Sequence, residues 1–181
     1  KCLGSFLRDD QQIQQGDRVA ILADNLANVI VLHYACTFIG AVIVNLNVRL
    51  VPHELEHILN DSTPKILASG VRYEQKIFET LEMMSKKNGA YAPKGVLWIG
   101  ETSEYPSSQK YQQFNFRDVI VSHRSKVDEH VIPTIVGGDD PCHIYYTSGT
   151  TGVPKGVVLS HRALLDHAVA AVAEFQIQQN D

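Results

Sequence analysis

The sequence is poor in cysteine and contains no long apolar run, and each absence excludes a class of protein. Its three cysteines, Cys2, Cys36 and Cys142, are scattered and odd in number. They imply no disulfide framework and favour a reducing compartment. No stretch reaches the ~18 consecutive apolar residues of a membrane-spanning helix, and the longest candidate is interrupted around His33. The first residues do not show the charged and apolar segments of a secretory signal sequence.

An excess of positive charge is also missing. Lys and Arg number 16 against 20 Asp and Glu, and the net charge of −4 argues against nucleic acid as the partner. The sequence has no internal repeat and no low-complexity tract. Its 181 residues, of which 44% are hydrophobic, are enough to bury the core of about one domain.

Both ends predict that the sequence is a piece of a longer protein. There is no initiator methionine, and Leu3, Phe6 and Leu7 are typical of the tail of an amphipathic helix. At the other end, a helix predicted over 163–175 runs into residues 176–181 with nothing to pack against it. We therefore expect truncation at both ends, which leaves no usable targeting information. Separately, we expect an intracellular protein, cytoplasmic or peroxisomal.

Strand-like and helix-like patterns alternate along the chain. They predict strands at 18–23, 41–44, 65–69, 95–99 and 143–146, and helices at 27–39, 52–60, 73–87, 114–124 and 163–175. Asp24 and Asn25 are candidate N-cap residues for the first of these helices, and Gly40 is placed to end it. The polar stretch 101–113 predicts a surface loop. This order indicates an α/β fold, layered, with a mostly parallel sheet and flanking helices.

One run carries most of the chemical information. Residues 145–156 read Tyr-Tyr-Thr-Ser-Gly-Thr-Thr-Gly-Val-Pro-Lys-Gly, which places four aliphatic hydroxyls and two glycines between an apolar strand and one lysine. Glycine lets the backbone approach a ligand closely, hydroxyls and freed N–H groups donate hydrogen bonds, and lysine adds a positive charge. This combination suits a polyphosphate.

The run is not a Walker A loop, because Gly149 and Gly152 are only three residues apart and Pro154 precedes the lysine. A lone Gly-x-x-Gly would favour an ordinary hairpin turn, but agreement over the whole of 147–156 is too specific for chance. Together with residues 157–162, the run resembles the AMP-binding signature of adenylate-forming enzymes. These are the acyl-CoA synthetases, 4-coumarate ligases, luciferases and peptide-synthetase adenylation domains.

The resemblance extends upstream. The stretches 16–22, 40–50 and 54–59 follow the order and spacing of the family, whereas 83–140 match it only loosely. Asn45 stands where many members have proline, and the turn around it is similar to one common in medium- and long-chain acyl-CoA synthetases. The resemblance implies that residues 1–181 are part of the large N-terminal AMP-binding domain of an acyl-CoA synthetase-like fold, without its C-terminal lid domain.

The family resemblance implies a two-step ligase. A carboxylic acid, fatty or related, attacks the α-phosphate of ATP to give an acyl-adenylate and pyrophosphate, and coenzyme A then takes the acyl group as a thioester. The implied cofactors are ATP and Mg²⁺, with magnesium bridging the phosphates and no direct protein ligand to the metal. The implied ATP-phosphate-binding residues are Thr147, Ser148, Gly149, Thr150, Thr151, Gly152 and Lys155.

The rest of the family's active site does not map onto this sequence. In the family, the Thr-Glu motif, the ribose-binding Asp, the hinge and the catalytic lysine all follow the signature. We therefore expect no catalytic residue within 1–181, and no complete adenylation by these residues alone. A peptide-synthetase adenylation domain, which a downstream carrier domain would reveal, stays open as an alternative. So does a non-catalytic nucleotide-binding module, which a missing downstream lysine would reveal.

A rival pattern comes from a different class of enzyme. The run 53–57, His-Glu-Leu-Glu-His, fits the zinc-peptidase pattern, in which His53 and His57 share one helix face and Glu54 acts as general base. Pro52 places His53 in the first helical turn, and no third ligand follows at a suitable spacing. The pattern therefore favours an ordinary amphipathic helix over a zinc peptidase.

Two nucleophile candidates have structural explanations. Ser160 lies next to His161, but no Gly-x-Ser-x-Gly elbow is present, and Ser160 fits the N-cap of the last helix. Cys142 sits just before a buried strand without a cationic neighbour that would lower its pKa. We interpret it as a structural thiol.

Overall fold

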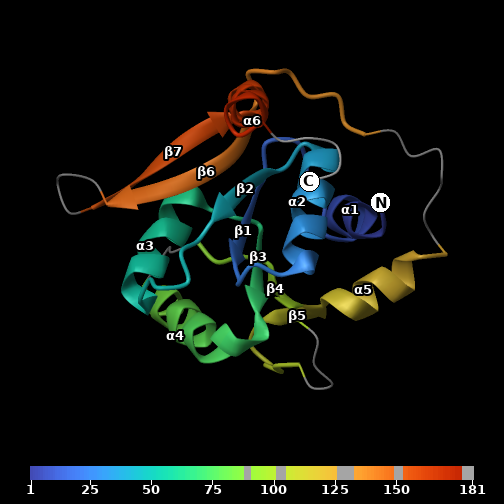
Figure 1. Cartoon of the computed structure of the whole chain (residues 1–181). Coiled ribbons are helices and arrows are strands. Elements are labelled where there is room, and N and C mark those ends of the chain that lie inside the picture. Colours follow the sequence, from blue (N-terminus) through green and yellow to red (C-terminus); the bar gives the residue numbers. More distant parts are fainter. Residues whose placement is uncertain (88–90, 101–104, 126–132, 149–152, 177–181) are drawn as a thin grey trace.

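Alternating strands and helices build one sheet with helices on both faces (Figure 1). The computed structural model describes residues 1–87, 91–100, 105–125, 133–148 and 153–176. The strands are β1 Arg18–Leu22, β2 Val42–Asn45, β3 Ile66–Gly70, β4 Gly95–Ile99, β5 Gln112–Asn115, β6 Pro141–Ser148 and β7 Pro154–Ser160. The helices are α1 Cys2–Ser5, α2 Ala27–Ile39, α3 Pro52–Ser62, α4 Glu74–Ser85, α5 Phe116–His123 and α6 His161–Glu174, with short helical turns at Phe6–Asp10 and Val71–Tyr73.

The strand order is β5-β4-β3-β1-β2-β6-β7. All neighbours run parallel except β7, which is antiparallel to β6. The predicted α/β class with a mostly parallel sheet is therefore confirmed. The part of the order that reads β2-β1-β3-β4-β5 is a doubly wound arrangement, in which the chain leaves β1 toward one edge and β3 toward the other.

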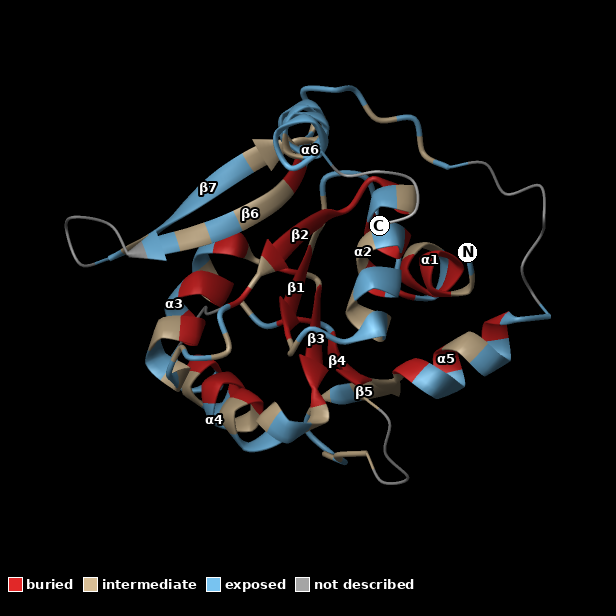
Figure 2. Ribbon diagram, viewed as in Figure 1, coloured by how far each residue is buried: buried red, intermediate tan, exposed pale blue. Residues whose placement is uncertain are grey.

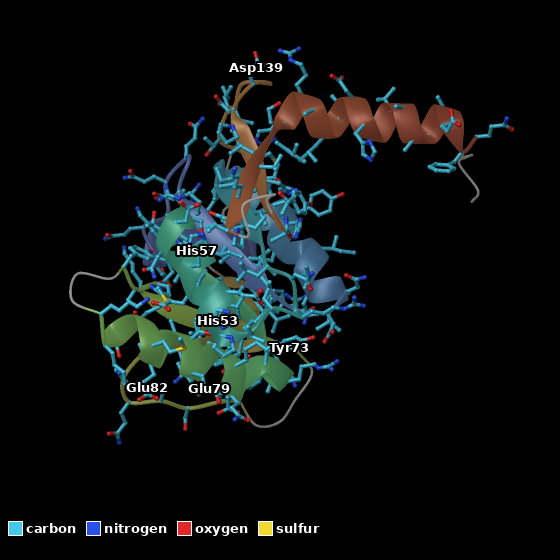
Figure 3. The ribbon with its side chains drawn as sticks, turned by 90° about the vertical axis from the view of Figure 1, so that its left-hand side faces the viewer. His53, His57, Tyr73, Glu79, Glu82 and Asp139 are labelled. Carbon is cyan, nitrogen blue, oxygen red and sulfur yellow. The ribbon has the colours of Figure 1, made fainter. Side chains whose placement is uncertain are left out.

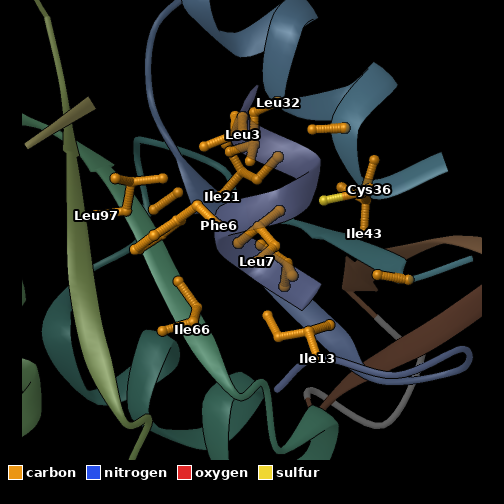
Figure 4. Close-up of a cluster of buried hydrophobic side chains, with 14 of the residues drawn as sticks. Leu3, Phe6, Leu7, Ile13, Ile21, Leu32, Cys36, Ile43, Ile66 and Leu97 are labelled. Carbon is orange, nitrogen blue, oxygen red and sulfur yellow. The ribbon is translucent and has the colours of Figure 1, made fainter. Parts of the chain in front are cut away.

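Two apolar cores lie on opposite faces of the sheet. On one face, α1, α2 and α5 cover the strands, and Leu3, Phe6 and Leu7 pack against Ile21 and Ile43 (Figure 4). These three N-terminal residues are buried, as an amphipathic helix tail would be. On the other face, α3 and α4 cover the strands, and their apolar side chains surround Trp98 of β4.

The centre of the sheet reads as continuous apolar runs because it is covered on both faces. Every residue of β3 and β4 is buried (Figure 2). α2 ends as predicted at Gly40, whose φ of 73° lies in the left-handed region that a glycine adopts without strain. None of the helices in the described part of the chain combines the length and apolarity that crossing a bilayer requires.

Two local predictions are wrong. Residues 112–115, assigned to a loop and a helix start, form the edge strand β5, and α5 begins at Phe116. This strand is polar and partly exposed, so its pairing with β4 rather than its own pattern decides its conformation. Asp24 does not cap α2, because its carboxylate accepts a hydrogen bond of 2.7 Å from the Tyr73 hydroxyl and lies 3.2 Å from Arg72 Nη1.

Candidate functional site

The signature run forms the end of the β6–β7 hairpin, which projects from one edge of the sheet (Figure 1). Thr147 pairs directly with Lys155, and Ser148 pairs with Pro154. Directly opposed residues of an antiparallel pair place their side chains on the same face. The Thr147 hydroxyl and the Lys155 ammonium group therefore belong to one face of the hairpin, next to the turn that joins the strands.

The structure thus brings together three of the seven predicted phosphate-binding residues: Thr147, Ser148 and Lys155. The other four, Gly149, Thr150, Thr151 and Gly152, lie outside the described residues. Their role, and that of the set as a whole, stays a prediction.

Lys155 is exposed, as is Thr147. Within the described part of the chain, Lys155 has no acidic side chain in ion-pairing distance. Its positive charge is therefore not neutralised by the described protein, and it can act on an anion beside the turn.

An open pocket of ≈ 640 Å³ lies beside this end of the hairpin, between β6, α3 and the loop after β2. Thr147 and Pro154 line it from the hairpin, and Glu54 lines it from α3. The Glu54 carboxylate accepts a hydrogen bond of 3.0 Å from the Val51 N–H, so it is already engaged in capping α3. The rest of the lining combines apolar side chains such as Leu50 and Ile58 with amide and hydroxyl groups.

Asn45 was not among the predicted site residues. It lines this pocket and also a second pocket of ≈ 820 Å³ beside α2. Its Nδ2 is buried and has no hydrogen-bond partner among the described residues. The one sequence signal at this position was the departure from the proline of many family members.

α3 contacts the hairpin at two points that the sequence did not indicate. The Tyr146 hydroxyl donates a hydrogen bond to Asp61 Oδ2, and His57 Nε2 lies 3.4 Å from the carbonyl oxygen of Pro154. Burial, followed by the bond to Asp61, raises the pKa of Tyr146, so its hydroxyl keeps its proton. The Tyr146 side chain belongs to the face of the hairpin opposite to Thr147 and Lys155, because Tyr146 and Thr147 are successive strand residues.

The face of the hairpin that carries Thr147 also carries the aromatic rings of His143 and Tyr145. His143 lies with its ring centroid 5.1 Å from that of His33 on α2, and its Nδ1 lies 3.2 Å from the Tyr145 hydroxyl. Burial, with smaller contributions from His33 and His161, lowers the pKa of His143 to about 4. His143 is therefore neutral at neutral pH.

The base of the hairpin is fixed by the turn before β6. Arg162, at the start of α6, places its Nε 3.0 Å from Asp139 Oδ1, and its backbone N–H donates to Gly138 at 2.7 Å. The Ser160 hydroxyl accepts a bond of 3.2 Å from Ala163 N, which confirms it as the N-cap of α6. Cys142 is buried, and burial raises the pKa of its thiol, in agreement with the interpretation of a structural thiol.

The zinc-peptidase alternative finds no support in the geometry. Glu54 is engaged in capping, and Glu56 is buried with its Oε1 2.6 Å from Lys87 Nζ. His53 faces a pocket shared with Glu79 and Glu82 of α4, whereas His57 faces Pro154 (Figure 3). No group of three or more potential metal ligands occurs among the described residues.

Comparison with known proteins identifies the family. The sequence profile of the family described as AMP-binding enzyme matches residues 1–181. A long-chain-fatty-acid–CoA ligase of Thermus thermophilus is 32% identical over 165 residues, which are 86% of this chain and 25% of that protein. A peroxisomal trans-cinnamate:CoA ligase of Petunia hybrida is 32% identical over 158 residues, which are 83% of this chain and 27% of that protein.

A solved structure agrees. A protein from Rhodopseudomonas palustris, described as a long-chain-fatty-acid CoA ligase, matches with a TM-score of 0.75 and 25% identity, over 98% of this chain and 39% of that one. Fold and hairpin together define a doubly wound α/β domain that carries a signature hairpin at its edge. The chain belongs to the AMP-binding enzyme family. It spans about a quarter of the length of the two curated relatives.

Proposed function

We propose that this chain supplies the ATP-phosphate-binding part of an acid–thiol ligase that activates a fatty or related carboxylic acid. The observation that carries the proposal is the pairing of Thr147 with Lys155 at the end of the β6–β7 hairpin. Lys155 is exposed and has no acidic partner among the described residues. This pairing supports the proposal, because a hydroxyl donor and a positive charge belong to one face at the end of the described strands. The names of the relatives, which are CoA ligases, support the reaction class.

In the proposed first step, a carboxylate oxygen attacks the α-phosphorus of ATP. The bond between that phosphorus and the oxygen bridging to the β-phosphate breaks, and pyrophosphate leaves with the bonding electrons. In the second step, the deprotonated thiol of coenzyme A attacks the acyl carbon, and AMP leaves through its phosphate oxygen. Both leaving groups are anions, so the barrier depends on positioned donors and positive charge.

The role of Lys155 is to hold and partly neutralise the β- and γ-phosphates while pyrophosphate separates. Thr147 and the other hydroxyls of the signature would orient those phosphates through hydrogen bonds. The donor set fits ATP with magnesium held by the phosphate oxygens, because the one carboxylate lining the pocket, Glu54, is engaged in capping. When bound, magnesium supplies additional neutralisation of the phosphate charge.

Substitution of Lys155 in the full-length enzyme tests the proposal. Lys155→Ala is expected to slow acid-dependent ATP–pyrophosphate exchange roughly 100-fold, the loss typical of one stabilising donor. Lys155→Arg, which keeps the charge, should recover part of the rate. Lys86→Ala is the matched control, since Lys86 is an exposed lysine on the α4 side, 2.9 Å from Glu82. An unchanged rate in Lys155→Ala would remove Lys155 from the reaction.

Residues 1–181 alone are expected not to complete adenylation, since no catalytic residue of the family maps onto them. Pyrophosphate release from ATP and a fatty acid by the isolated 181-residue chain, at the rate of the full-length enzyme, would contradict this expectation. The cytoplasmic or peroxisomal location stays a prediction.

A further inference from the structure

Asn45 lies between two pockets. It is the last residue of β2, and it lines both the pocket of ≈ 640 Å³ beside the hairpin and the pocket of ≈ 820 Å³ beside α2. Its Nδ2 is buried and has no hydrogen-bond partner in the described part of the chain. An unpaired buried donor is unfavourable, so it favours a ligand that brings an acceptor. The terminal torsion of asparagine is broad, so the amide can turn this donor toward a pocket.

The strand register aligns Asn45 with residues of the signature. Ile43 packs in the core that α2 covers, and side chains alternate along a strand, so Asn45 belongs to the α2 side of the sheet. Asn45 pairs with Tyr145 of β6, and Thr147 follows two residues later on the same face. One face therefore carries the Asn45 side chain, the Thr147 hydroxyl and, through strand pairing, Lys155.

The pocket beside α2 adds an apolar wall on this face. It is lined from the ends of β1 and β2 and from α2 by apolar side chains that include Ile21, Val29, Ile30 and Leu46. The Asp24 carboxylate in its lining is engaged with the Tyr73 hydroxyl, and burial lowers the pKa of His33, which is neutral at neutral pH. A volume of ≈ 820 Å³ lies within the roughly 300–1,000 Å³ of small-molecule sites. The pocket has room for an apolar chain or ring.

We propose that the pocket beside α2 binds the apolar part of the carboxylic acid, and that Asn45 binds its carboxyl group between the two pockets. Nδ2 donates a hydrogen bond to a carboxylate oxygen, and the carbon chain lies against Val29 and Ile30. Asn45 is then a substrate-binding residue. This assignment rests on the proposed function and adds to it the place of the acid.

The order of groups along the face suits the reaction. An apolar wall comes first, then the neutral donor of Asn45, and then the hydroxyl of Thr147 and the charge of Lys155. An acid bound in this way presents its carboxylate toward phosphates held at Lys155, which brings the two reactants together. A neutral amide orients the attacking carboxylate and withdraws less of its charge than a cation would.

The first test replaces Asn45 in the full-length enzyme and follows ATP–pyrophosphate exchange. Asn45→Ala is expected to raise the KM for dodecanoic acid about tenfold, with the KM for ATP unchanged. Asn45→Asp, which has nearly the same shape, should raise it further because two carboxylates repel each other. A rise in the KM for ATP alone would place a phosphate oxygen at Asn45 and would overturn the assignment to the acid.

The second test uses a matched pair on α2. Ile30 and Val31 are 60% and 44% exposed, and of the two only Ile30 lines the pocket. Ile30→Asn is expected to raise the KM for dodecanoic acid about tenfold and that for butanoic acid much less, because the longer chain buries more surface there. Val31→Asn should leave both unchanged. Equal effects of the two variants, or an effect independent of chain length, would contradict the assignment of the pocket.

Folding and binding are separated by a measurement without activity. Because Nδ2 has no partner among the described residues, Asn45→Ala should change the melting temperature of the full-length enzyme little. A large fall with an unchanged KM would make Asn45 structural and overturn the proposal. A wild-type enzyme without exchange would overturn the proposed function instead. Calorimetric titration with dodecanoate in the absence of ATP would then still decide, since equal binding by wild type, Asn45→Ala and Ile30→Asn would refute the site.

Discussion

The centre of the sheet and the β6–β7 hairpin use similar apolar residues in opposite environments. Every residue of β3 and β4 is buried, whereas no residue of β7 is (Figure 2). Val158 is 55% exposed, and α6 has no buried residue although it contains leucines, valines and alanines. Within these 181 residues, buried side chains are therefore concentrated between the helices, and the candidate site lies on the more exposed edge of the sheet.

The largest expected difference in the free energy of unfolding is between truncation of a buried aliphatic side chain and truncation of an exposed one. Leu67→Ala, in the middle of β3 and fully buried, should lower the free energy of unfolding by about 2–5 kcal/mol through lost contacts and a cavity. Val158→Ala should change it by less than ~0.5 kcal/mol. Urea unfolding of the chain monitored by fluorescence measures both. Equal losses would mean that the hairpin contributes to the same core.

Lowering the pH should destabilise the folded chain through His143, which lies on the β6–β7 hairpin. Because the pKa of His143 is lowered to about 4 in the folded state, the unfolded chain binds a proton there more readily. Stability is therefore fully present above the ordinary value near 6.5 and falls as the pH drops from 6.5 toward 4. The loss is on the order of 1 kcal/mol, reduced by partial exposure of the ring.

His143→Gln should flatten this pH dependence, and thermal unfolding between pH 4 and pH 7 measures it. His53→Gln, at an exposed position on α3, is the control and should leave the slope as it is. A slope that persists in His143→Gln would assign the effect to another group, with His33 the first candidate because burial also lowers its pKa.

The smallest expected changes in stability come from two helix N-caps, in each of which a side-chain oxygen accepts hydrogen bonds from backbone N–H groups. The Asn115 side chain accepts 2.8 Å and 3.3 Å bonds from Arg117 N and Asp118 N at the start of α5, and Ser160 caps α6. Removing either cap costs about 1 kcal/mol of helix stability. α5 packs into a core, so Asn115→Ala should lower the global unfolding free energy. Ser160→Ala should instead raise amide exchange within α6 alone, and a global loss would contradict this.

The sequence predicted most of the fold because apolar runs between two helical layers have few alternative conformations. β1 to β4 and the helices α2 to α4 appear near their expected places. β5 was missed because its residues, from Gln112 to Asn115, are polar and become a strand only through pairing with β4. Asp24 was misjudged as a cap because its partner, Tyr73, is 49 residues away.

At the candidate site too, local sequence patterns were informative and long-range contacts were not predicted. The signature predicted a phosphate-binding set from ten contiguous positions whose donors suit phosphate; the structure pairs Thr147 with Lys155, and the role of the set stays a prediction. It did not predict Asp61, which is 85 residues from Tyr146, or a contact of His57 with the hairpin, since the pattern around His57 favoured only an ordinary amphipathic helix. Local patterns indicate the chemistry of a loop, whereas contacts between residues far apart in the sequence depend on which helix the sheet brings alongside.

The place of β7 at the end of the described sheet has a practical consequence. An outermost strand offers a row of backbone donors and acceptors to any other chain that can lie beside it. β7 contains a single charged side chain, that of Lys155, and its Val157 and Val158 are 44% and 55% exposed. Solutions of these 181 residues are thus expected to grow oligomers by strand addition as concentration rises, and a charge such as Val158→Lys should oppose that growth.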